Sequence, residues 1–147
     1  MKAAPAKTGS GRLLAGVLLS ALVALGQTPT LVQSNAALGT SVSSLPVSFS
    51  SSNTVGNLIV ASVRIATTTQ TVTIADALGN TYTSAVSQAQ STDGHQIFIF
   101  YAKNIKAGTN TVTATFSASN AHAWLAVYEY SGLGTTTALD GTAHASG

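Results

Sequence analysis

The feature that most constrains this chain is a series of short β-branched and aromatic clusters with turn-forming residues between them. Hydrophobic period and turn signals predict strands at residues 31–34, 42–49, 58–65, 71–75, 81–88, 96–102, 110–116 and 123–130. Residues 117–120 are expected to form a turn. No helix-period stretch occurs after residue 26. The pattern predicts an all-β, antiparallel β-sandwich, with jelly-roll and immunoglobulin-like topologies both open.

Alternation along the predicted strands indicates which faces are wet. In residues 111–116, Val112, Ala114 and Phe116 share one face and three threonines share the other, so we expect a solvated threonine face. The segments 58–65 (LIVASVRI) and 97–101 (IFIFY) are instead apolar on both faces for most of their length. A loop or a further layer is therefore expected to cover their outer side.

The first 26 residues have the organisation of a secretory leader. Lys2, Lys7 and Arg12 precede the apolar run 13–25 (LLAGVLLSALVAL). As a helix this run would span roughly 20 Å, short of the ~30 Å hydrocarbon core, so we favour a cleaved Sec signal-peptide helix over an uncleaved anchor. Cleavage near Gly26 would leave residues 27–147 as one secreted or cell-surface domain without a permanent membrane span.

Charge and cysteine content exclude several classes of protein. The chain has no cysteine, which rules out lipidation at the cleavage site and stabilising disulfides. Three of its six basic residues lie in the leader, so residues 27–147 keep three basic against four acidic side chains, a formal charge of −1. That balance argues against nucleic acid as a partner, because nucleic-acid binding needs a basic patch.

Four segments, in order, resemble a recurrent domain of exported bacterial proteins. They are residues 56–60 (GNLIV), Asp76 with residues 79–82 (GNTY), residues 101–105 (YAKNI) and residues 129–133 (EYSGL). The resemblance is to a Ser/Thr-rich β-sandwich surface domain of jelly-roll or immunoglobulin-like type with no settled activity. In that family a segment like residues 139–147 precedes further strands, so the resemblance implies a C-terminally truncated domain with an unpaired sheet edge. The alternative is that the strands present suffice alone.

The polar residues do not assemble a metal or cofactor motif. Asp76 with residues 77–80 has too few carboxylates for calcium and is interpreted as a hairpin turn with Gly79 or Asn80 at positive φ. The turn at residues 93–94 is interpreted in the same way. The three histidines, His95, His122 and His144, are isolated in sequence, so we expect no metal and no cofactor.

The sequence also offers little for catalysis. A glycosidase would need paired carboxylates, and a serine hydrolase of the usual kind would have a Gly-x-Ser-x-Gly turn, which is missing. Glu129 ends an apolar strand and is interpreted as a charge paired at the sheet end, with Arg64 as its partner. We therefore expect no catalytic residue; an incomplete glycan-active hydrolase is the least favoured alternative.

The last predicted strand carries an aromatic face formed by Trp124, Tyr128 and Tyr130. Such a face can stack sugars, or it can pack into the core with Leu125 and Val127 turned outward. We favour the core because a lone tryptophan in a small domain is more often buried. The sequence thus predicts a non-catalytic structural or adhesive module, with other domains of a larger surface protein or a cell-surface glycan as partner. The alternative is a carbohydrate-binding module that uses these three residues.

Overall fold

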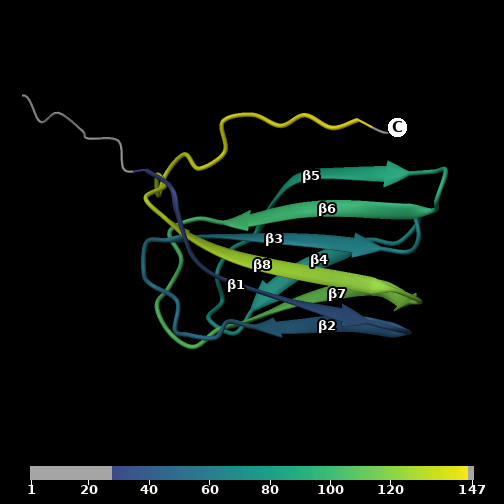
Figure 1. Ribbon diagram of the computed structural model, residues 1–147, viewed down its shortest axis with the longest axis horizontal. Coiled ribbons are helices and arrows are strands. Elements are labelled where there is room, and N and C mark those ends of the chain that lie inside the picture. The colour runs from purple at the N-terminus through teal and green to yellow at the C-terminus, as the bar shows by residue number, and fades with distance from the viewer. Residues whose placement is uncertain (1–27, 146–147) are drawn as a thin grey trace, which may run out of the picture.

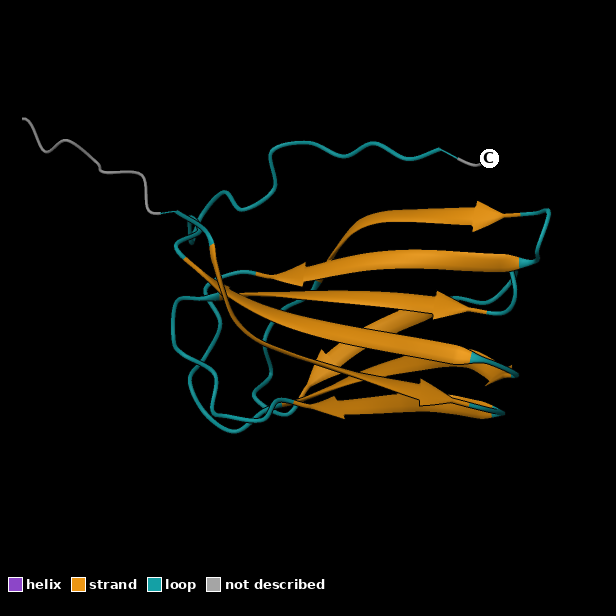
Figure 2. Ribbon diagram, viewed as in Figure 1, coloured by secondary structure: helices purple, strands orange, loops and turns teal. Residues whose placement is uncertain are grey.

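The computed structural model describes residues 28–145, which form strands, turns and loops and contain no helix (Figures 1 and 2). The strands are β1 (Thr30–Gly39), β2 (Val42–Ser48), β3 (Leu58–Ile65), β4 (Val72–Asp76), β5 (Thr83–Gln90), β6 (His95–Ala102), β7 (Thr111–Asn120) and β8 (Ala123–Ser131). The predicted leader, residues 1–26, and its cleavage site at Gly26 lie outside the described residues. Within residues 28–145 there is no helix long and apolar enough to cross a membrane.

The strands form two antiparallel sheets that pack face to face. The larger sheet has the order β1-β8-β3-β6-β5, and the smaller has the order β2-β7-β4. Figure 2 shows the two layers, with the loops gathered at the ends of the strands. This arrangement confirms the predicted all-β sandwich.

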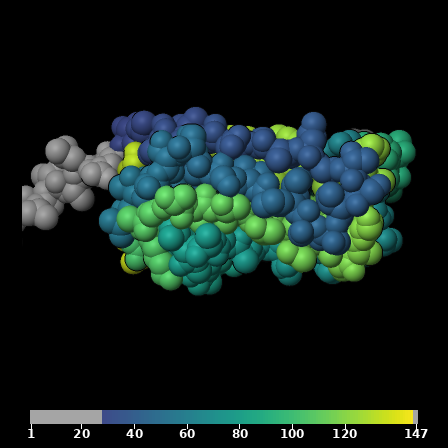
Figure 3. All heavy atoms as spheres, turned by 90° about the horizontal axis from the view of Figure 1, so that it is seen from below, coloured from purple at the N-terminus to yellow at the C-terminus, as the bar shows by residue number. Residues whose placement is uncertain are grey.

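The order of strand pairing follows a jelly roll. The first strand pairs with the last (β1 with β8), the second with the seventh (β2 with β7), and the third with the sixth (β3 with β6). In an immunoglobulin-like sandwich the first two strands lie in one sheet, whereas here β1 and β2 lie in different sheets and together close one edge (Figure 3). The departure from the usual jelly-roll order is β5, which pairs with β6 and not with β4.

The core lies between the sheets and is filled by alternate residues of the central strands. Its fully buried members include Ile59, Ala61, Val63 and Ile65 of β3, Leu125 and Val127 of β8, and Val112 and Ala114 of β7. The opposite face of β7 carries Thr111 and Thr113, which are half-buried, and the exposed Thr115. The predicted threonine face is therefore confirmed.

Several boundaries and turns differ from the prediction. Residues 117–120 were expected to form a turn, but β7 continues to Asn120 and pairs there with Val42 beyond a bulge in the register. The β1 strand extends to Gly39 because pairing with β8 supplies what its small, polar sequence lacks. The turn after Asp76 has Gly79 at φ +65°, as expected, but it joins strands of different sheets, so the predicted hairpin is wrong.

Candidate functional site

The aromatic residues of β8 lie on the outer face of the five-stranded sheet. Leu125 and Val127 have no exposed surface and belong to the core, whereas Trp124, Tyr128 and Tyr130 alternate with them and are half-buried. The core interpretation of Trp124 is therefore wrong. Alternation alone gives two equivalent faces, and the position of the smaller sheet decides that the aliphatic row of β8 is the covered one.

The strand register shows which side chains surround these aromatic residues. Directly paired residues of antiparallel strands project to the same face. Tyr128 is aligned with Val60 of β3, which is aligned in turn with Tyr101 of β6. At the start of β8, Trp124 is aligned with Arg64 of β3. The outer face therefore combines aromatic rings with one cationic side chain.

The dimensions of this face follow from strand geometry. Trp124 and Tyr128 are four residues apart on one strand, which corresponds to roughly 13 Å. Tyr128 and Tyr101 are two strands apart, which corresponds to roughly 10 Å. We call the outward-facing residues Trp124, Tyr128, Tyr130 and Tyr101 the aromatic platform. Its extent leaves room for more than one sugar ring.

Part of the outer face is lined by the C-terminal segment, residues 132–145. Figure 1 shows this segment running along the β5 side of the larger sheet, and the Lys103 ammonium donates a hydrogen bond to the carbonyl of Thr136. Ala145 lines a pocket together with outward-facing residues of β3, β5 and β6. The expected cover is thus a loop over part of the face, and Ile97 remains 46% exposed.

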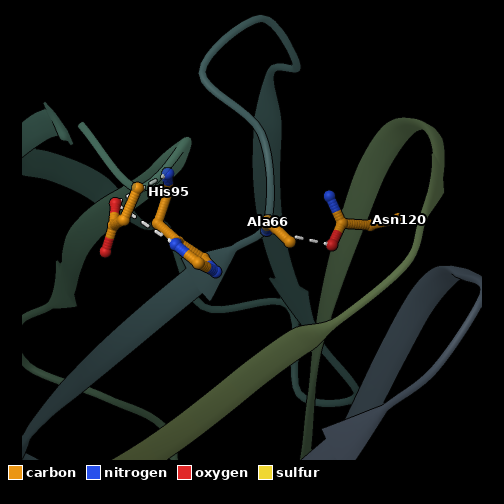
Figure 4. Close-up of polar contacts among 4 residues, drawn as sticks. Ala66, His95 and Asn120 are labelled. Carbon is orange, nitrogen blue, oxygen red and sulfur yellow. Dashed lines mark hydrogen bonds and ion pairs between the residues drawn. The ribbon is translucent and has the colours of Figure 1, made fainter. Parts of the chain in front are cut away.

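That pocket has a volume of about 230 Å³, and five of its seven lining residues are polar. Its lining residues are Arg64, Gln88, Gln90, Asp93, His95, Ile97 and Ala145. His95 Nδ1 lies 3.2 Å from a carboxylate oxygen of Asp93, and the backbone N–H of His95 donates to the same oxygen (Figure 4). Slight desolvation would raise the pKa of Asp93, but these two groups of His95 and the nearby Arg64 guanidinium lower it.

Glu129 is the most deeply buried charged residue of the described chain, and sequence reasoning assigned it the wrong partner. Its side chain has no exposed surface. Arg64 does not pair with it, because Arg64 is aligned with Trp124 whereas Glu129 is aligned with Ile59, five residues back along β3. Arg64 and Glu129 each lie near the C-terminal end of their strand. Because β3 and β8 are antiparallel, these two ends lie at opposite edges of the sheet.

Four neutral N–H donors take the place of a cation around Glu129. One carboxylate oxygen accepts hydrogen bonds from the side-chain amides of Gln33 (2.7 Å) and Asn53 (2.6 Å). The other accepts from the backbone N–H of Thr54 (2.8 Å) and the side-chain amide of Asn57 (2.7 Å). Burial would raise the pKa of Glu129, but these donors lower it below its ordinary value. This cluster ties the loop at residues 49–57 to β1 and β8.

A second carboxylate cluster forms around Asp76 at the end of β4. Its oxygens accept hydrogen bonds from the Asn80 backbone and side chain (2.9 and 2.7 Å), from the Tyr82 hydroxyl (3.0 Å) and from the Asn110 amide (3.0 Å). Burial would raise the pKa of Asp76, but the donors, Asn110 foremost, lower it. Burial and the adjacent carboxylate raise the pKa of Tyr82. Both clusters stabilise loops. The asparagines in these loops are the sequence signal from which the two clusters could have been predicted.

The histidines and carboxylates do not form a metal centre in the described region. No group of three His, Asp or Glu side chains within residues 28–145 is placed to hold a metal ion. Asn120 is fully buried, and its side-chain oxygen accepts from the backbone N–H of Ala66 (3.2 Å; Figure 4). The same oxygen accepts from the backbone N–H of His122 (3.1 Å), which fixes the turn before β8. Asn120 beside His122 and Asp93 beside His95 are thus held by hydrogen bonds to the backbone.

Comparison with protein-family models, with curated proteins and with solved structures finds no match for this chain. The geometry of the outer face and its pocket therefore carries the functional inference.

Proposed function

We propose that this chain is a non-catalytic, extracellular binding module that holds carbohydrate on the outer face of its five-stranded sheet. The observation that carries the proposal is the position of Trp124, Tyr128 and Tyr130, which project away from the core. The C–H face of a sugar ring packs against an aromatic ring, and tyrosine hydroxyls exchange hydrogen bonds with sugar hydroxyls. The rigid strand β8 holds these rings at fixed spacing, which limits the entropy lost on binding.

Two further observations support a non-catalytic role. Glu129 is fully buried and both of its oxygens already accept two hydrogen bonds, so its carboxylate has no access to a ligand. Asp76 accepts hydrogen bonds from three neighbouring side chains in the same manner. With these two carboxylates committed to loop stability, the paired acid and base of a glycosidase are not provided by them.

The cellular setting of the proposal comes from the sequence. The leader-like residues 1–26 indicate export, and the formal charge of −1 after their removal suits a partner other than nucleic acid. The resemblance to Ser/Thr-rich bacterial surface domains suggests attachment to, or assembly with, a larger surface protein. In this setting the bound glycan would give the module an adhesive role.

The test is retention of residues 27–147 on insoluble polysaccharides, with the single tryptophan as an internal reporter. We expect Trp124→Ala and Tyr128→Ala to reduce retention at least tenfold, and Trp124→Phe to restore most of it because a ring is kept. Thr113→Ala, on the outer face of the smaller sheet, is the matched control and should bind like the unmodified chain. Folding of each variant is checked by circular dichroism.

Ligand binding should also change the emission of Trp124 and protect it from a soluble quencher. If no glycan in a broad panel is retained by the folded chain, or if Trp124→Ala and Thr113→Ala bind equally, the carbohydrate proposal is wrong. A purely structural module would then remain.

A further inference from the structure

We propose that the pocket beside Trp124 binds the carboxylate of an acidic sugar, so that the ligand is a uronic-acid-containing glycan. This inference rests on the proposed carbohydrate binding and specifies the class of carbohydrate. The pocket and the aromatic platform are continuous: Arg64 lines the pocket, and it is aligned with Trp124 on one side and with Ile97 on the other. One ligand could therefore contact both.

Arg64 is the group that would recognise the carboxylate. It is exposed, and no hydrogen bond or ion pair with another described residue engages its guanidinium. A guanidinium offers planar, paired N–H donors that match the two oxygens of a carboxylate. An arginine that stabilises the fold is normally held by hydrogen bonds to a partner, whereas Arg64 has only an electrostatic interaction with Asp93, so its N–H groups can donate to a ligand.

The other pocket residues favour a sugar over a small inorganic anion. Ile97 supplies an apolar wall, and Trp124 supplies a ring surface next to Arg64. The amide of Gln88 donates to the carbonyl of Ala89 (2.8 Å), which fixes the side chain at the pocket wall. A sulfate or phosphate ion would use the guanidinium alone, whereas a sugar acid would use the charge and the apolar surface together.

The carboxylate of Asp93 would repel the carboxylate of a bound acidic sugar, which gives a second test of the inference. Its carboxylate lies in the pocket lining, 3.2 Å from His95 Nδ1, and is close enough to Arg64 to interact with it electrostatically. It therefore offsets part of the positive field that a carboxylate would meet. Removing its charge should strengthen binding of an acidic ligand and leave a neutral ligand unaffected.

The experiment compares oligogalacturonate with the same oligosaccharide after methyl esterification, which removes the charge and keeps the rings. Calorimetric titration of residues 27–147 should show at least tenfold tighter binding of the free acid. Arg64→Gln should abolish this difference by weakening free-acid binding about tenfold without changing binding of the ester. Asp93→Asn should tighten free-acid binding severalfold.

Lys106→Gln is the control for a change in net charge, because Lys106 lies in another loop and donates to the carbonyls of Leu78 and Gly79. It should preserve the preference for the free acid. Equal binding of acid and ester by the unmodified chain would overturn this inference and leave the carbohydrate proposal intact. Binding of neither, with no other glycan retained, would instead overturn the proposed function.

If Arg64→Gln does not fold, the Asp93→Asn variant decides the question. Tighter binding of oligogalacturonate by that variant supports an anion in the pocket, and unchanged or weaker binding refutes it. Retained preference for the acid in a folded Arg64→Gln variant would equally refute the assignment.

Discussion

Replacing Glu129 by glutamine tests whether the buried carboxylate is held by neutral donors. The substitution keeps the size of the side chain but converts one of two acceptor oxygens into an NH₂ group. Each oxygen accepts two hydrogen bonds, one pair from Gln33 and Asn53, the other from Thr54 and Asn57. In either orientation of the new amide, two donors therefore lose their acceptor.

The expected cost follows from these four contacts. A hydrogen bond to a buried charged group contributes about 1.5–3 kcal/mol. The side-chain oxygen of Asn53 is buried without a partner, so a rotation of that amide can recover one contact with the new NH₂ group. We therefore expect Glu129→Gln to lower the free energy of unfolding by about 2–4 kcal/mol near neutral pH, and the Tm by about 10 °C.

The pH dependence of the unfolding free energy tests independently whether ionised Glu129 stabilises the fold. The pKa of Glu129 in the folded state is lowered below its ordinary value. Its stabilisation is therefore complete above the unfolded pKa of about 4.3 and is lost as the pH falls through the lower, folded value. Asp76 behaves in the same way. The unmodified chain should thus lose stability below about pH 4, and Glu129→Gln should lose less over that interval.

The assay is denaturant unfolding followed by tryptophan fluorescence near neutral pH and at about pH 3. Asp93→Asn is the matched control, since it also removes one carboxylate but from an exposed turn, and it should lower the free energy of unfolding far less than Glu129→Gln. The reasoning would be refuted if Glu129→Gln were as stable as the unmodified chain near neutral pH, or if it lost stability equally on acidification.

Three further substitutions test the remaining structural assignments. Tyr82→Phe removes the hydroxyl that donates to Asp76 and should cost about 1 kcal/mol by thermal unfolding. Gly79→Ala places a side chain at φ +65° and should cost about 1–2 kcal/mol in the same measurement. Leu125→Ala opens a cavity in the core and should cost about 2–5 kcal/mol, whereas Thr113→Ala on a solvated face should change unfolding little; similar values for the two would contradict the assignment of faces.

The sequence was sufficient for the fold class because the relevant signals are local. The alternation of Val112, Ala114 and Phe116 with threonines, and turn residues such as Gly79, depend only on near neighbours along the chain. The exposed side of Trp124 was not predictable in the same way. Both rows of β8 are apolar, and which row is covered depends on where the smaller sheet lies, a property of the assembled sandwich.

The contacts of the candidate site were likewise not predictable from the sequence. Glu129 and Arg64 were expected to pair because each lies near the end of an apolar strand, but antiparallel alignment separates them. The donors that surround Glu129 come from positions as distant as Gln33 and Asn57, and the pocket joins β3, β5 and β6. Contacts between residues far apart in sequence leave no periodic pattern by which they can be recognised.

The pairing of the first strand with the last has a consequence for how the chain reaches its native state. Thr30 is aligned with Ser131, so β1 has no hydrogen-bonded strand partner until β8 has been synthesised. Folds dominated by such distant pairings form slowly, since the entropy of closing a long loop is lost before the stabilising contacts form. For a chain that we propose carries a secretory leader, slow pairing of β1 with β8 would keep the polypeptide unfolded while it passes through the membrane.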